Sequence, residues 1–144
     1  MAEVIASLCA TNEHPGRHIN CREVTKATLK AATALTTSYV ATDHVRCASA
    51  NLINLELTYV HGSAPSIEWY VEWSSDATNW FRDTNTATST GTNTITANNS
   101  TLATSASVKV TQLFTVKDYY MRVNYKSTTN ADGTLAIDAI LLTL

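Results

Sequence analysis

Charged side chains are scarce in this sequence. Asp, Glu, Lys and Arg make up 15% of its 144 residues, against roughly 25% in an ordinary soluble domain. No two basic residues are adjacent, and the formal net charge is −2. Because nucleic-acid-binding proteins usually carry a basic patch, we expect no nucleic-acid partner. No apolar run approaches the ~18–20 residues of a membrane-spanning helix, so we expect no membrane partner.

A secretion signal and a disulfide framework are also missing. The opening segment MAEVIASLCATNEH has neither the basic start nor the long apolar core of a signal peptide. This indicates a chain that is made in a cytoplasm and is not secreted. The cysteines are Cys9, Cys21 and Cys47. An odd number of cysteines without a secretion signal argues against structural disulfides.

Thr, Ser and Asn take the place of the missing charges. Thr favours β-strands, and Ser and Asn favour turns. Apolar residues alternate with polar ones in NLINLELTYV, where Ile53, Leu55, Leu57 and Tyr59 share one face, and such alternation is typical of half-buried strands. The length suits one domain. We therefore predict an all-β, single-domain antiparallel β-sandwich, jelly-roll-like, with about seven or eight strands.

Three segments are harder to interpret. Residues 22–37 fit a helical face loosely, but their many threonines favour extended structure. Residues 84–107 are low in complexity and uncharged, which is compatible with a long exposed loop or an irregular edge strand around Ile95. Residues 1–22 lack alternation, and we predict that they form an extended arm that orders against another subunit, while residues 23–144 form the sandwich.

The stretch SIEWYVEWSSDATNW contains all three tryptophans of the chain. Trp69 and Trp73 share parity with Ile67 and Val71. Because a strand of a sandwich buries one of its faces, this pattern predicts that both tryptophans lie in the core rather than on a sugar-binding surface. Tyr70 has the opposite parity and is the one plausible stacking surface of this strand.

No catalytic site is predicted. Glu68 and Glu72 lie on one face of the same expected strand, about 13 Å apart, which is wider than the roughly 5–10 Å that separates glycosidase carboxylates. His44 and His61 have no Ser or Cys nucleophile nearby in a recognisable motif. We therefore expect a protein that is not an enzyme.

Cys9, His14, His18 and Cys21 are a candidate metal site because thiolates and imidazoles are good zinc ligands. Their spacing, C-x4-H-x3-H-x2-C, matches no common zinc motif, and the sequence HPG reads simply as a turn. The two interpretations are a compact zinc site and an N-terminal arm that crosses onto a neighbour. We favour the arm and expect no bound metal or other cofactor.

Two stretches together resemble a class of small virion proteins of tailed bacteriophages. They are LTYVHGSAPSIEWYVEWSSDATNWF and YYMRVNYKSTTNADGTLAIDAILLTL. Such proteins carry a Tyr-x-x-Gly corner, a Ser-x-Asp-x-x-x-Trp turn, a Tyr-x-Arg-Val strand and a Gly-Thr-Leu strand, and often have glycine where this chain has Ala77. The matching positions are Tyr59, Gly62, Ser74, Asp76, Trp80, Tyr120, Arg122, Val123, Gly133, Thr134 and Leu135.

The resemblance implies a structural role in a virion. The expected protein is a capsid decoration protein that binds the major capsid protein, or another virion protein, as a homo-oligomer and stabilises the assembled shell. A neck or tail component is the alternative within the same class. An alternative of a different class is a carbohydrate-binding module for host attachment, supported by the aromatic residues and by the Ser-x-Asp turn, which also occurs in discoidin-like sandwiches.

Overall fold

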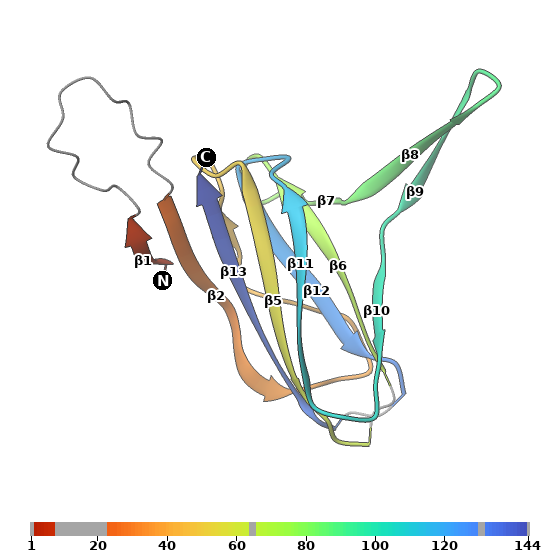
Figure 1. Ribbon diagram of the computed structural model, residues 1–144. Coiled ribbons are helices and arrows are strands. Elements are labelled where there is room, and N and C mark those ends of the chain that lie inside the picture. The colour runs from red at the N-terminus through yellow and green to blue at the C-terminus, as the bar shows by residue number, and fades with distance from the viewer. Residues whose placement is uncertain (1, 8–22, 64–65, 130–131, 144) are drawn as a thin grey trace, which may run out of the picture.

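The computed structural model describes residues 2–7, 23–63, 66–129 and 132–143. Within these ranges the chain forms thirteen strand segments and no helix, and antiparallel sheets pack against each other (Figure 1). This confirms the predicted all-β sandwich. In the same ranges no helix has the length and apolar character needed to cross a membrane.

The first sheet contains five strands, each antiparallel to its neighbours. Its order is β1 (Ala2–Ser7), β2 (Glu23–Ala34), β13 (Thr134–Thr143), β5 (Leu52–Val60) and β11 (Val108–Thr115). The segment around residues 22–37 is therefore extended, as its threonines predict. Ala2–Ser7, part of the expected arm, pairs with β2 of the same chain, and residues 8–22 lie outside the described residues.

The second sheet is built around β6 (Ser66–Ser74) and β12 (Tyr120–Ser127), which pair from Ser74 with Tyr120 to Ile67 with Ser127. The remaining strands of this sheet are short: β10 (Ser100–Ala103) and β7 (Phe81–Arg82) pair with β6, and β3 (Val40–Ala41) and β4 (Val45–Arg46) pair with β12. Such short segments raise the number of strands above the seven or eight expected from alternation, because a two-residue bridge has no detectable period.

Residues 84–97 include a strand around Ile95, one of the two expected structures, but this strand does not extend either sheet of the sandwich. They make a separate two-stranded hairpin, β8 (Thr84–Ser89) and β9 (Thr92–Ala97), which projects from one end of the sandwich (Figure 1). The hairpin turns through Thr90 and Gly91, which both have positive φ, 49° and 80°. This is the backbone of a type I′ turn, whose twist matches that of the two strands it joins.

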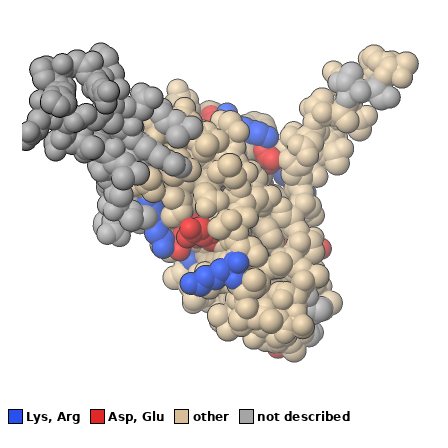
Figure 2. Space-filling model, viewed as in Figure 1, with Lys and Arg blue, Asp and Glu red and all other residues tan. Residues whose placement is uncertain are grey.

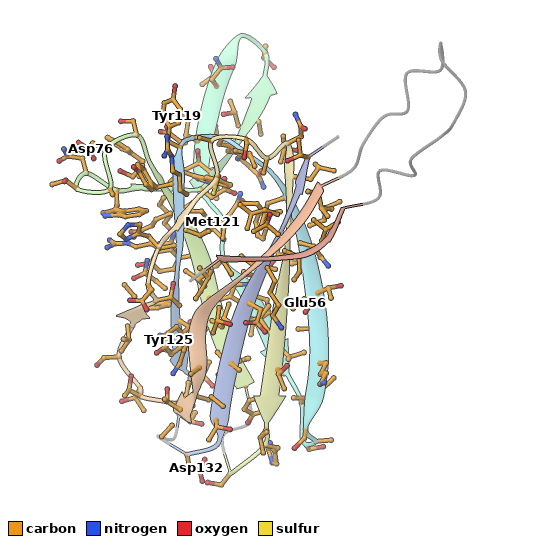
Figure 3. All side chains as sticks on the ribbon, turned by 90° about the vertical axis from the view of Figure 1, so that its left-hand side faces the viewer. Glu56, Asp76, Tyr119, Met121, Tyr125 and Asp132 are labelled. Carbon is orange, nitrogen blue, oxygen red and sulfur yellow. The ribbon has the colours of Figure 1, made fainter. Side chains whose placement is uncertain are left out.

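The hydrophobic core lies between the first sheet, which has five strands, and the second sheet, which has six. Trp69 and Trp73 are 6% and 4% exposed, which confirms their predicted place in the core. Met121 is fully buried, and Figure 3 shows it between the sheets, with Asp76 and Tyr119 at one end of the sandwich and Asp132 at the other. The alternating burial of β5 and β6 follows the sequence pattern residue by residue.

The glycines of the Tyr-x-x-Gly and Gly-Thr-Leu motifs meet at the corner near Asp132. A Cβ on Gly62 would lie 2.5 Å from the backbone nitrogen of Gly133, and one on Gly133 would lie 2.8 Å from the carbonyl oxygen of Val60. Gly133 also has a φ of 80°, a conformation that side chains disfavour. The Tyr-x-x-Gly and Gly-Thr-Leu motifs therefore describe one close backbone contact between β5 and β13.

Candidate functional site

Aromatic and charged side chains gather on the outer face of the second sheet. Because Trp69, Val71 and Trp73 point into the core, the intervening residues of β6 point outward, as do their partners on β12. We call this surface the aromatic face; it comprises Tyr39, His44, Glu68, Tyr70, Glu72, Trp80, Arg82, Tyr120, Arg122, Asn124 and Lys126.

The two glutamates of the aromatic face belong to separate ion pairs. Glu72 accepts hydrogen bonds from Arg122 Nε at 2.6 Å and from Asn124 Nδ2 at 2.8 Å. Glu68 accepts a hydrogen bond from the Tyr39 hydroxyl at 3.0 Å and lies 3.3 Å from Lys126 Nζ. Each carboxylate thus pairs with its own cation, Arg122 or Lys126, an arrangement that suits structural cross-strand pairing.

Cations cover three of the aromatic rings. The Arg82 guanidinium lies 4.0 Å from the centre of the Tyr70 ring, and the Arg122 guanidinium lies 4.3 Å from that of Trp80. Lys126 Nζ lies 4.8 Å from the centre of the Tyr39 ring. Such contacts stabilise by about 0.5–1 kcal/mol each at exposed sites. A ligand that stacks on these rings must use the opposite ring faces or displace the cations.

Tyr70 is the centre of this network. Its ring meets that of Tyr39 edge to face, with 4.9 Å between the ring centres. Burial, followed by the negative charge of Glu72, raises the pKa of the Tyr70 hydroxyl, although Arg82 opposes the shift. Tyr70 is therefore a neutral phenol at neutral pH, with a hydroxyl that can donate a hydrogen bond. The sequence identified Tyr70 as a stacking surface, but it gave no sign of the cation that covers it.

The Ser-x-Asp-x-x-x-Trp motif forms a closed turn beside the aromatic face. Asp76 Oδ1 accepts hydrogen bonds from the backbone N–H groups of Thr78 and Asn79, both at 2.8 Å, and from the Ser74 hydroxyl at 3.0 Å. The backbone N–H groups of Asn79 and Thr78 are the main cause that lowers the pKa of Asp76 far below its usual range. Ala77 has a φ of 58°, so the turn does require the conformation that glycine favours.

A narrow crevice of about 290 Å³ opens next to Tyr70, between β6 and the base of the hairpin. Its lining contains four side-chain amides and three aromatic residues. The lining residues are Trp69, Tyr70, Val71, Asp83, Asn85, Asn98, Asn99, Ser100, Gln112 and Phe114. Trp69 Nε1 donates to Gln112 Oε1 at 2.9 Å. Amides beside an aromatic ring can bind a small hydroxylated ligand.

Asp83 forms the inner wall of the crevice and is 4% exposed. It accepts hydrogen bonds from Trp73 Nε1 at 3.0 Å and from Asn98 Nδ2 at 2.6 Å, and it forms an ion pair with Lys117 at 2.5 Å. Burial by itself would raise the pKa of Asp83, but the hydrogen bonds from Lys117, Asn98 and Trp73 outweigh burial and lower it. Asp83 is thus a satisfied, buried anion.

The hairpin β8–β9 is the most exposed part of the described chain. Every residue of β9 is exposed, and Ile95 is 69% exposed. No charged residue occurs between Asp83 and Lys109, and the hairpin in Figure 2 shows no acidic or basic side chain. A two-stranded hairpin with no hydrophobic core is at best marginally stable in water.

The histidines and cysteines named from the sequence do not come together in the described part of the chain. His44 packs against Trp80 and Tyr120, and His61 shares a hydrogen bond of 3.1 Å with the Tyr59 hydroxyl. Cys47 is buried, and burial raises the pKa of its thiol to about 12. Among the described residues no group of three His, Cys, Asp or Glu is placed to hold a metal ion.

The candidate zinc ligands Cys9, His14, His18 and Cys21 all lie outside the described residues. Their two interpretations therefore remain predictions.

No protein-family model matches the sequence, and no curated protein matches it.

Proposed function

We propose that this chain is a virion structural protein of a tailed bacteriophage, which binds in many copies to the outer surface of the assembled capsid and stabilises it. Its partners are the major capsid protein and further copies of itself, and it acts without catalysis, cofactor, nucleic acid or membrane. It is made in the host cytoplasm and resides in the virion. A neck or tail position is the alternative within this proposal.

The projecting hairpin is the observation that carries the proposal. It has fourteen residues, from Thr84 to Ala97, and none of those whose side chains are described belongs to the hydrophobic core or is a hydrophobic residue packed against it. A marginal element of this kind gains stability when another protein covers it. An assembly subunit can use such an element as a contact with its neighbours.

The chemistry of the surface supports the same proposal. Thr, Ser, Asn and Ala can pack against a similar surface with little cost for the desolvation of charges. The two sheets also have edges that a neighbouring chain can extend. Because such a protein binds only the assembled shell, its binding stabilises the shell by mass action.

Particles with and without the protein test the proposal. We expect particles that lack it to assemble but to release DNA at a lower temperature, and we expect hundreds of copies in each complete particle by quantitative mass spectrometry. An unchanged DNA-release temperature together with a dozen copies or fewer would reject capsid decoration in favour of the neck or tail. Absence of the protein from purified particles would reject the virion assignment.

Glycan binding is the second candidate function, favoured by the crevice beside Tyr70. Its volume is close to the lower end of the range for small-molecule pockets, roughly 300 Å³. Its amides resemble the hydrogen-bonding groups that sugar hydroxyls need. The cation over the Tyr70 ring weighs against a ready stacking platform, so we rank this function second.

A glycan array followed by ligand-observed NMR tests glycan binding. Tyr70→Ala should abolish binding, because it removes the outward-facing aromatic side chain of a residue that lines the crevice. Tyr119→Ala is the matched control, since Tyr119 is 57% exposed and does not line this crevice. Equal loss in both variants, or no binding by the native chain, would rule out the crevice as a glycan site.

A further inference from the structure

The carboxylate of Asp83 lies between an amine and a carboxamide that come from different parts of the chain. Its Oδ1 contacts Lys117 Nζ at 2.5 Å, and its Oδ2 accepts a hydrogen bond from Asn98 Nδ2 at 2.6 Å. Lys117 belongs to the link between β11 and β12, whereas Asn98 directly follows β9. A neutral amine is a nucleophile, a carboxamide carbon is an electrophile, and a carboxylate between the two can carry protons.

We propose that Lys117 and Asn98 form an intramolecular isopeptide bond after the chain has folded, with Asp83 as the catalytic acid and base. Lys117 Nζ attacks the Cγ carbon of Asn98. The bond between Nζ and Cγ forms, the bond between Cγ and Nδ2 breaks, and Nδ2 leaves as ammonium. Because one nitrogen replaces another on the same carbon, the reaction needs no cofactor, no oxidant and no second substrate.

The two oxygens of Asp83 contact the two nitrogens between which protons must move. Lys117 begins as an ammonium group with three protons and ends as an amide N–H with one. The two protons that it loses pass, one after the other, through the carboxyl group of Asp83 to Asn98 Nδ2. The leaving nitrogen thereby becomes ammonium, and Asp83 is again a carboxylate at the end, so atoms and charges balance.

The burial of Asp83 makes the reactive state accessible. Its side chain is 5% exposed, whereas that of Lys117 is 47% exposed. Transfer of one proton within the ion pair turns two charges into two neutral groups, and low-dielectric surroundings reduce the cost of this change. The ion pair remains the ground state, so the bond should form slowly in the newly folded chain. The exposed side of Lys117 leaves a path for ammonium to reach solvent.

Further hydrogen bonds hold the reacting groups in place. Trp73 Nε1 donates to Asp83 Oδ1 at 3.0 Å, and the backbone N–H of Asp83 donates to the Val71 carbonyl at 2.9 Å. The backbone N–H of Asn98 donates to the Asp83 carbonyl, also at 2.9 Å, which keeps the two residues together at the base of the hairpin. Groups held in this way react at effective concentrations far above those of the same groups free in solution.

The isopeptide bond would join the base of the hairpin to the link that precedes β12. Because β10 and β11 lie between its two ends in the sequence, the bond closes a loop that contains both strands. Such a cross-link lowers the entropy of the unfolded chain and so stabilises the folded one. The reaction occurs once in each chain and on no external substrate, and it does not depend on the proposed virion role.

Mass spectrometry of the purified full-length chain tests the proposal. During incubation at neutral pH a growing fraction of the native chain should lose about 17 Da, the mass of ammonia, whereas hydrolysis of the Asn98 amide would add about 1 Da. Peptide sequencing should place the bond between Lys117 and Asn98. Trypsin should no longer cut after Lys117 in the linked fraction, because its amine has become an amide.

Three variants assign the roles of the reacting groups. Lys117→Arg keeps a cation beside Asp83 but removes the nucleophile, so it should keep its full mass. Asp83→Asn keeps the shape of the side chain but removes the proton carrier, and it should slow the reaction by about 100-fold or more. Lys109→Arg, a change within β11, is the matched control and should lose ammonia as fast as the native chain does. Near-native tryptophan fluorescence shows that each variant is folded.

The outcomes separate the parts of the proposal. An unchanged mass of the folded native chain after prolonged incubation would overturn the bond, whatever the effect of the protein on particles. Loss of water, about 18 Da, with the bond at Asp83 would overturn both the assignment to Asn98 and the role of Asp83 as proton carrier. Loss of ammonia by Lys117→Arg would overturn the nucleophile, and an unchanged rate in folded Asp83→Asn would overturn the catalytic role of Asp83.

Discussion

The indole N–H of Trp73 donates a hydrogen bond of 3.0 Å to the carboxylate of Asp83. This contact connects the centre of the core to the residue that precedes the hairpin. Asp83 also accepts from Asn98, which follows the hairpin, and pairs with Lys117. Both ends of the hairpin are thus fixed to the sandwich through one buried carboxylate, which sets the direction in which the hairpin projects.

Replacement of Asp83 by alanine should destabilise the protein. The change leaves the buried Trp73 indole N–H without its acceptor, at a cost of about 1–3 kcal/mol for an unsatisfied group, and it removes one of the two acceptors of the Asn98 amide. Chemical denaturation monitored by tryptophan fluorescence measures this loss. Asp43→Ala is the matched control, because Asp43 is exposed and should change stability by less than about 0.5 kcal/mol. Similar losses in both variants would contradict the anchoring role.

The same carboxylate should make stability depend on pH. Hydrogen bonds lower the pKa of Asp83 in the folded state despite burial, so its contribution is present above the pKa of an unfolded aspartate, about 3.9. That contribution is lost as the pH falls through the lower, folded pKa. Between pH 5 and pH 2 the Asp83→Ala variant should lose less stability than the native chain. Parallel stability curves for the two proteins would show that Asp83 does not contribute to the acid sensitivity.

Ala77→Gly should stabilise the turn. Ala77 has a φ of 58°, and a left-handed conformation costs an L-residue about 1 kcal/mol. Glycine removes this cost but adds entropy to the unfolded chain, so we expect a net gain of about 0.5 kcal/mol. Ala103→Gly, within β10, should instead destabilise by a similar amount. Thermal unfolding of both variants measures the difference, and a loss of stability in Ala77→Gly would show that the turn is not strained.

Gly133→Ala should be severe. The added methyl group would lie 2.8 Å from the Val60 carbonyl oxygen, and the residue would keep a φ that alanine disfavours. Relief requires β5 and β13 to separate at their shared corner, so we expect a loss of more than about 2 kcal/mol. Gly91→Ala is the matched control, because Gly91 also has a positive φ but a Cβ added there would have no atom within 4 Å. If Gly91→Ala loses less stability than Gly133→Ala, the difference is due to the close contact with Val60 rather than to the positive φ. Equal losses in chemical denaturation would contradict the role of that contact.

Sequence alternation predicted the parts of the fold where one face of a strand is buried. Trp69 and Trp73 are in the core because their parity matches that of Ile67 and Val71, and β5 behaves in the same way. The hairpin escaped prediction because both of its faces are exposed, so no alternation marks its strands. Its Thr90-Gly91 turn is also a weaker signal than Asn-Gly.

The candidate site was less visible in the sequence than the core. Tyr70 was identified by parity alone, but Arg82 reaches it from a two-residue strand that has no period. Asp83 forms an ion pair with Lys117, which lies 34 positions away in the sequence. No local sequence pattern predicts a contact over such a separation. Paired charges on opposite strands become visible only when the register of β6 and β12 is known.

Limited proteolysis provides the last prediction, which concerns residues 1–22. Trypsin should cut the isolated protein after Arg17 or Arg22, because this segment contains Pro15 and Gly16 and lacks the alternation of a strand. Arg46 is the internal control, since it lies in β4 and pairs with Tyr120, and it should resist cleavage. The pairing of Ala2–Ser7 with β2 should keep the released peptide associated after the cut. In assembled particles we expect the same sites to be protected, because we predict that this segment orders against a neighbouring subunit. Equal cleavage rates in the isolated and assembled states would contradict this role.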